Sequence, residues 1–202
     1  GKVIAHADMR IEIAEGAFAD DAVIALLPSR VDHPGPELIP LSPAYTAHSP
    51  QSYAGRGSRL RAVLPNGSSE RAGIYRYAEG RWQWVESTHH SGSLQVELGQ
   101  LGRYALMEDR TPPRIVTRDE YALTIADAGS GLAQVEVFMA EVPLSPSAYE
   151  WDGETLTLDP SYIPAANSAL RVQATDRSGN VGNLAFSDRK STRLNSSHQI
   201  IS

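Results

Sequence analysis

The chain lacks several features that would place it in a well-defined chemical class. It has no cysteine, so neither a disulfide framework nor thiolate chemistry is available to it. No apolar run approaches the roughly 18 residues that a membrane-crossing helix needs, so we expect no membrane insertion. Its 24 acidic residues outnumber 18 basic ones. The formal net charge of −6 argues against nucleic-acid binding, which needs a basic face to displace counterions.

What is present points to an all-β protein. The 202 residues include 16 glycines and 13 prolines and show little helical periodicity, which favours many turns and short strands. This length allows one large domain or two small ones. The chain has no initiator Met and opens on Gly1 in what resembles a strand, so we expect an internal fragment of a longer protein.

The clearest pattern occupies residues 71–109. β-branched and aromatic residues predict a strand over 73–77, a tight turn, and a hairpin partner over 81–85. Strict alternation over 93–98 puts Leu94, Val96 and Leu98 on one face. A closing strand is expected over 103–107.

Residues 1–58 are less regular. Alternation predicts a strand over 9–13, and the continuous apolar run 22–27 is typical of a strand covered on both faces. The stretch 28–50 contains many prolines, which cannot donate to a sheet ladder, so we expect a long surface loop with extended pieces there. A further strand is expected over 59–64.

The pattern restarts after a short proline-containing segment. Residues 110–113 are expected to form a semi-rigid linker between a first module, 1–109, and a second, 114–187. In the second module, strands are expected around Leu123, Val137 and Val172, with turn signals between them. The sequence therefore predicts two tandem β-sandwich modules.

The C-terminal segment differs in its residue pattern from the rest of the chain. The segment 188–202 reads DRKSTRLNSSHQIIS, shows no hydrophobic period, and resembles a translated sequencing adapter. A natural basic tail is the alternative interpretation. We expect this tail to be disordered and to carry no function.

The second module resembles a bacterial immunoglobulin-like domain. The residues that carry the resemblance are Asp127 with 130–132, the Trp-Asp-Gly at 151–153, and the run VQATDRSGN at 172–180. The resemblance implies an immunoglobulin-like sandwich, a fold that hosts many functions.

The first module is similar to ZU5-like β modules. The carrying residues are the segments 15–18, 73–77 and 101–106, with Trp82 and Asp109. The tandem resembles the C-terminal part of M23-type peptidases, zinc endopeptidases of peptidoglycan. The resemblance implies a bacterial protein that is periplasmic, secreted or on the outer surface, with its catalytic domain elsewhere in the chain.

The residues present do not form a recognisable catalytic site. M23 catalysis needs a His-x-x-x-Asp pair and a His-x-His pair around zinc, and neither spacing occurs. His6 precedes Asp8 by only two residues, and the adjacent His89 and His90 would point to opposite faces of a strand. We expect His89 and His90 in a solvated turn, no metal or other cofactor, and no enzymatic activity.

Four aromatic residues form one candidate binding site. Trp82 and Trp84 share a face of one predicted strand, and Tyr75 and Tyr77 share a face of its partner. An exposed aromatic platform could stack on sugar rings, but large aromatic side chains are more often buried. We expect this face to pack against a second sheet, with at least one tryptophan mostly buried.

Oxygen-bearing turns form a second candidate. Asp127, Asp176 and Asn180 lie near strand ends, where a Ca²⁺ site is conceivable. Aspartate and asparagine also suit turns by bonding the nearby backbone, and turn chemistry is the favoured interpretation.

These observations predict a non-catalytic spacer or docking region of a secreted or cell-envelope bacterial protein. Its expected partners are neighbouring domains of a longer chain and, in addition, peptidoglycan or another surface glycan. One alternative is an accessory region of an M23-type peptidase, and another is a glycan-binding module.

Overall fold

The computed structural model describes residues 1–18, 23–50, 56–119, 121–162 and 169–186. The chain divides into two compact units, Gly1–Arg110 and Thr111–Ser202, and the division falls within the proline-containing segment 110–113. In the described ranges the fold is all β, apart from the short 3₁₀ turns Pro146–Ala148 and Pro160–Tyr162. No helix in these ranges has the length and apolarity to span a membrane. The expected tail, 188–202, lies outside the described residues.

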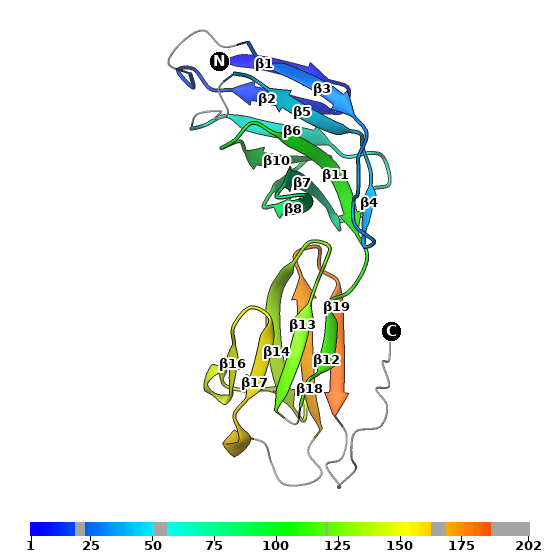
Figure 1. Ribbon diagram of the computed structural model, residues 1–202, viewed down its shortest axis with the longest axis vertical. Helices are drawn as coiled ribbons and strands as arrows, with labels where there is room; N and C mark the ends of the chain where they lie inside the picture. The colour runs from blue at the N-terminus through cyan, green and yellow to red at the C-terminus, as the bar shows by residue number, and fades with distance from the viewer. Residues whose placement is uncertain (19–22, 51–55, 120, 163–168, 187–202) are drawn as a thin grey trace. The chain divides into compact units, whose positions relative to one another are not determined.

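The first unit is a sandwich of two antiparallel sheets (Figure 1). One sheet has the order β1-β2-β6-β10-β9, formed by Lys2–His6, Met9–Ile13, Arg59–Val63, Ser93–Glu97 and Thr88–His90. The other has the order β3-β5-β11-β7-β8, formed by Ala25–Ser29, Ala44–His48, Arg103–Asp109, Ala72–Ala78 and Arg81–Val85. The short strand β4, Leu38–Pro40, also pairs with β11.

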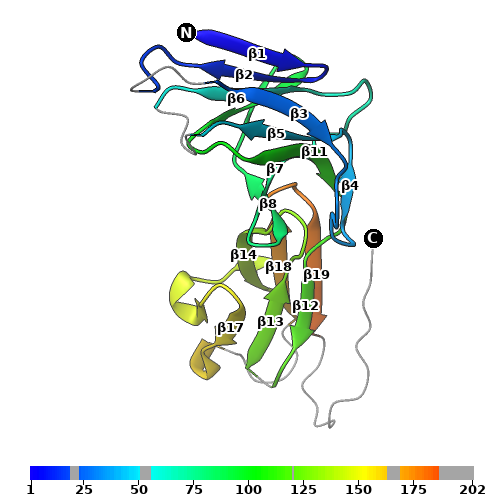
Figure 2. The same cartoon turned by 45° about the horizontal axis from the view of Figure 1, so that its top comes forward.

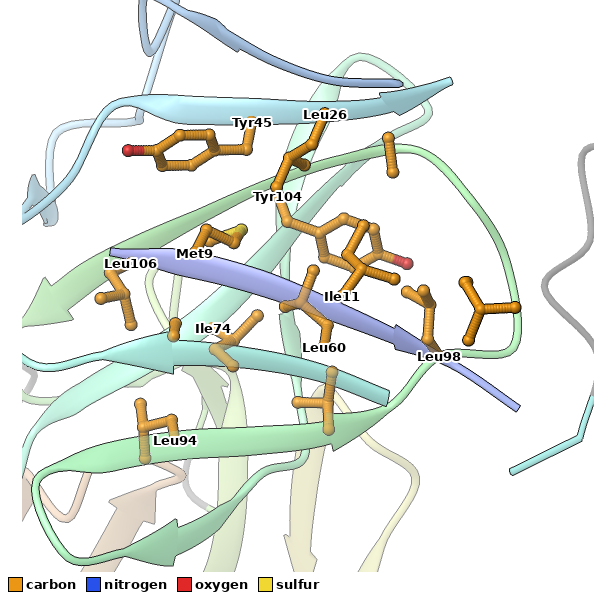
Figure 3. Close-up of a cluster of buried hydrophobic side chains, with 14 residues drawn as sticks. Met9, Ile11, Leu26, Tyr45, Leu60, Ile74, Leu94, Leu98, Tyr104 and Leu106 are labelled. Atoms are coloured by element: carbon orange, nitrogen blue, oxygen red, sulfur yellow. The ribbon is translucent and has the colours of Figure 1, made fainter. Parts of the chain in front are cut away.

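The core of this unit follows from period-two alternation. Met9 and Ile11 on β2, with Leu60 on β6 and Leu94 on β10, are fully buried. They meet side chains from the opposite sheet, among them Tyr45, Ile74, Tyr104 and Leu106 (Figure 3). Because successive side chains of a strand point to opposite faces, the alternation predicted over 9–13 and 93–98 is confirmed as the inward face of one sheet.

Two sequence-based expectations for residues 22–50 are wrong. The run 22–27 is not a strand covered on both faces: β3 begins only at Ala25, and Val23 and Leu27 are 80% and 55% exposed. Leu26 is buried in the core and Ile24, just before the strand, packs against it, whereas Leu27 points to the opposite, exposed face. The proline-rich stretch 28–50 also holds β5, a strand paired on both sides.

The second unit is also a sandwich of two antiparallel sheets. One has the order β12-β13-β17-β16, formed by Arg114–Thr117, Ala122–Ala126, Thr155–Leu158 and Tyr149–Trp151. The other has the order β15-β14-β18-β19, formed by Val142–Pro143, Leu132–Met139, Leu170–Asp176 and Val181–Phe186. The chain is therefore built from two β-sandwiches in tandem.

The core of the second unit lies between these sheets. Leu123 and Ile125 on β13, together with Leu156 on β17, face Val137 on β14 and Val172 on β18. β12 lies beside β19 at the sandwich margin (Figure 2). A Cβ added to Gly182 on β19 would lie 2.1 Å from the Pro113 carbonyl oxygen, so this close approach of two backbones requires glycine.

Candidate functional site

The four candidate aromatic residues lie on one hairpin of the first unit. β7 and β8 are joined by Glu79 and Gly80, both at positive φ, in the tight turn that the sequence predicted. The resulting register pairs Tyr75 with Trp84 and Tyr77 with Trp82. The two pairs meet edge to face, with ring centroids 5.4 and 5.2 Å apart, an arrangement that adds about 0.5–1.5 kcal/mol beyond area burial.

The aromatic face is not the face that packs against the second sheet, so that expectation is wrong. Ile74 and Val85, on the other face of the hairpin, contribute to the core between the sheets. Tyr75 and Trp82 instead form a separate cluster on the outer face, with Ala105 and Met107 of β11. We call this group the outer aromatic cluster; its remaining members are Val31, Leu38, Ala44, Tyr77 and Trp84.

The expectation that at least one tryptophan is mostly buried is confirmed. Trp82 is 5% exposed, and its indole nitrogen donates a hydrogen bond to the Asp32 carbonyl oxygen at 3.0 Å. Tyr75 is fully buried, whereas Tyr77 and Trp84 are half-buried. Val31 and Leu38, from the connection between β3 and β5, pack into the same cluster. A sugar ring could therefore reach only Tyr77 and Trp84 without displacing this segment.

The position of the Trp84 ring requires that residue 73 is glycine. Gly73 lies two residues before Tyr75, the cross-strand partner of Trp84, and therefore on the same face; its φ is not in the left-handed region. A Cβ built on Gly73 would lie 2.0 Å from Cζ3 of the Trp84 ring and 2.6 Å from Cη2. The six-membered ring of the indole thus occupies the space that a Cβ of residue 73 would need, so only glycine leaves room for it.

Arg103 contacts the outer aromatic cluster, which the sequence did not reveal. Its guanidinium carbon lies 5.6 Å from the ring centroids of both Tyr77 and Trp82, within cation–π range. The same guanidinium donates to the Asp32 carboxylate at 2.9 Å and to the Arg30 carbonyl oxygen. These partners are separated from Arg103 by more than 70 residues, so no local sequence pattern could have identified them.

The oxygen-bearing residues of the second unit come together at one end of the sandwich. Asp127 and Asp176 place carboxylate oxygens within 4.8 Å of each other. Asp176 is buried and accepts hydrogen bonds from the Asn180 backbone N–H at 2.8 Å and from its side-chain amide at 2.7 Å. Asp127 accepts a hydrogen bond from the Gly131 N–H.

These bonds give the three residues a role in turn formation. Both oxygens of Asp176 are engaged by Asn180, which closes the β18–β19 turn. The geometry agrees with the favoured interpretation that Asp127, Asp176 and Asn180 stabilise turns, and the calcium alternative is addressed by a test in the Discussion.

His6 and the neighbouring His89 and His90 lie on β1 and β9, the two opposite edge strands of one sheet. His89 and His90 are exposed as expected, but they lie on a strand and not in a turn, so that part of the expectation is wrong. His6 is also exposed, and its ring centroid lies 5.6 Å from that of Tyr45. In the described part of the chain, no group of three or more potential metal ligands includes a histidine.

Two polar contacts in the first unit were also not predicted. The Tyr45 hydroxyl donates to the Asp8 carboxylate; burial, reinforced by this hydrogen bond, raises the pKa of Tyr45 to about 12 and keeps the phenol protonated. The buried Glu108 accepts hydrogen bonds from Arg110 at 2.6 Å and from Ser69. The Arg110 bond is the main reason that the pKa of Glu108 is lowered, against the opposing effect of burial.

Comparisons with known proteins return no relatives. No protein-family model matches the chain, and neither a curated protein nor a solved structure matches it.

Proposed function

We propose that this chain is a non-catalytic pair of β-sandwich modules that spaces, orients or docks a neighbouring domain of a secreted or cell-envelope bacterial protein. One observation carries the proposal: the polar groups that the sequence singled out are engaged in holding the fold. The Trp82 indole N–H is bonded to a backbone carbonyl, and both Asp176 oxygens are bonded to Asn180. Side chains used in this way supply structure rather than a reactive group.

The second unit is proposed to be immunoglobulin-like. Its strand orders, β12-β13-β17-β16 and β15-β14-β18-β19, correspond to the A-B-E-D and C-F-G sheets of that fold, with β15 as an added edge strand. The fold is used for many tasks and supports the spacer proposal only through its rigidity.

The spacer and docking versions of the proposal can be separated in the parent protein. Replacing residues 1–187 by an unrelated tandem sandwich of similar length keeps the spacing but removes the native surface. A spacer predicts that the parent keeps its localisation and activity, whereas docking predicts that localisation or activity is lost. Equal performance of the parent with the whole segment deleted would contradict both versions.

A role beside an M23-type catalytic domain is a more specific form of this proposal, and it rests on the sequence resemblance. Its test is the coding sequence upstream of Gly1, which must encode the His-x-x-x-Asp and His-x-His pairs. The present chain is expected to release no peptidoglycan fragments with or without zinc, because its sequence contains neither the His-x-x-x-Asp nor the His-x-His pair. Chelator-sensitive hydrolysis by the purified chain would contradict the non-catalytic assignment.

Glycan binding is a second candidate, favoured by the half-buried rings of Trp84 and of Tyr77, which lies beside Arg103. Aromatic rings with one accessible face can stack on sugars, and a guanidinium can donate to their hydroxyl groups. A polysaccharide pull-down with wild type, Tyr77→Ala and Trp84→Ala tests this role. Retention that is abolished in both folded variants supports glycan binding, and absence of retention in wild type excludes it.

A further inference from the structure

The connection between β6 and β7 contains an exposed Asn-Gly pair. Asn66 and Gly67 are both exposed, and Gly67 has a φ of +83°. The Ser68 backbone N–H and hydroxyl donate to the Pro65 carbonyl oxygen at 3.1 and 2.8 Å and so close a four-residue turn. These bonds use neither the Asn66 side-chain amide nor the Gly67 N–H.

We propose that Asn66–Gly67 is a site of spontaneous covalent modification, at which Asn66 converts to aspartate and isoaspartate through a cyclic succinimide. The reacting atoms are adjacent in the chain: the Gly67 backbone nitrogen and the Asn66 side-chain carbonyl carbon, Cγ. A Cβ built on Gly67 would meet no atom within 4 Å other than those of its chain neighbours, so no other segment crowds the turn at this residue. Glycine itself adds no side chain that would hinder the attack.

The reaction balances with water as its one co-reactant. The Gly67 nitrogen gives up its proton to solvent and attacks Cγ of Asn66. A new C–N bond forms, the bond from Cγ to the amide nitrogen breaks, and that nitrogen leaves as ammonia. Water then opens the ring at either carbonyl. Opening at the side-chain carbonyl gives aspartate, and opening at the main-chain carbonyl gives isoaspartate. No group is oxidised or reduced.

The chain contains a matched site that should resist the same reaction. Asp152–Gly153 is also an exposed turn pair, but the Asp152 carboxylate accepts hydrogen bonds from the Glu154 and Thr155 backbone N–H groups at 2.9 and 2.6 Å. The bond from Thr155, followed by that from Glu154, lowers the pKa of Asp152. An ionised and anchored carboxylate is a poor electrophile, so ring closure should be slow there.

Two other asparagines of the described ranges serve as internal references. Asn180 is buried and bonded to Asp176, and it precedes Val181. Asn183 precedes Leu184, and its side-chain oxygen accepts a hydrogen bond from Arg171 at 3.2 Å. A branched side chain follows each of them, and both amides are held in place. Asn66 should therefore react many-fold faster than either.

The test is a time course of the full chain at physiological temperature and mildly alkaline pH, followed by peptide mapping under acidic conditions. Mass spectrometry measures amide-to-acid conversion, and protein-isoaspartate methyltransferase labelling measures isoaspartate. We expect the Asn66 peptide to convert progressively, with isoaspartate in several-fold excess over aspartate, while the Asn180, Asn183 and Asp152 peptides stay intact. The Asn66→Gln variant should show no conversion at this turn, because its longer side chain disfavours ring closure.

A synthetic peptide of residues 59–71, incubated in parallel, gives the rate of Asn66 conversion in the absence of the fold. Conversion in the folded chain at a rate near that of the peptide supports the proposal. If the peptide converts and Asn66 in the folded chain does not, the turn holds the reacting atoms apart and the proposal is wrong. It is also wrong if Asn66 converts no faster than Asn183.

Discussion

Replacing Gly73 by alanine is the sharpest test of how the outer aromatic cluster packs. Gly73 has no positive φ, so its backbone can accept an alanine without strain. In a strand interior, alanine in place of glycine is normally favourable by roughly 0.5–1 kcal/mol. The Trp84 ring reverses this sign, because the new Cβ would lie 2.0 Å from Cζ3.

The expected magnitude follows from what must move. The contact is with the body of an indole ring rather than a flexible chain end, and the ring is packed edge to face against Tyr75. Overpacking of this kind typically costs about 1–3 kcal/mol of unfolding free energy. This cost exceeds the favourable effect of replacing glycine by alanine, so the variant should be destabilised. Domains of this size have margins of about 5–15 kcal/mol, so the variant should fold but unfold at clearly lower urea concentration.

The assay is a urea titration followed by tryptophan fluorescence in a Trp151→Phe background. Of the three tryptophans, Trp82 and Trp84 then remain, and both report on the first unit. Gly99→Ala is the matched control, since Gly99 is exposed, has no positive φ and has no atom within 4 Å of an added Cβ.

A double-mutant cycle with Trp84→Ala isolates the contact, with circular dichroism as the common probe. Once the indole is removed, Gly73→Ala should become neutral or stabilising. If Gly73→Ala destabilises equally with and without the indole, the clash is not the cause. If it does not destabilise the wild type at all, the packing described for Trp84 is wrong.

Three further predictions concern stability. Trp82→Ala should cost about 3–5 kcal/mol because it empties a buried site, and a urea midpoint equal to that of the parent would contradict the burial. The lowered pKa of Glu108 contributes stability above the unfolded-state pKa of about 4.3, and this contribution is lost as the pH falls through the folded pKa. Glu108→Gln should therefore flatten the acid limb of a stability–pH profile, and an unchanged limb would refute the role of the Arg110 contact. Ca²⁺ should leave the melting temperature unchanged, because Asn180 engages both oxygens of Asp176; a Ca²⁺-dependent rise that disappears in Asp176→Asn would show a metal site.

Local pattern was enough to predict the all-β class and most strand positions. The β7–β8 hairpin was predictable because Glu79-Gly80 is a two-residue turn that fixes the register of both strands. Alternation over 9–13 identified the buried positions Met9 and Ile11, since a one-residue shift would have exposed them. The turn at Asp176 was also predictable from local sequence, because the Asp176 carboxylate bonds to Asn180, only four residues away.

The arrangement of the outer aromatic cluster could not be predicted, because it depends on contacts between residues far apart in the sequence. Period-two alternation separates Trp82 and Trp84 from Val85, but it does not say which of the two faces meets the opposite sheet. Arg103 reaches Asp32, and Tyr45 reaches Asp8, across 71 and 37 residues of sequence. The edge position of β3, which leaves Leu27 exposed despite an apolar run, likewise depends on sheet order.

The sequence by itself therefore determined most of the strands and short turns, because these depend on neighbours within a few residues. Tertiary structure alone decided that the aromatic face lies outside the main core. Ile74 and Val85 fill the space between the sheets, while Val31 and Leu38 pack with Trp82 on the outer face. That choice depends on where a proline-containing segment from another part of the chain comes to lie, which is settled only when the whole unit is packed.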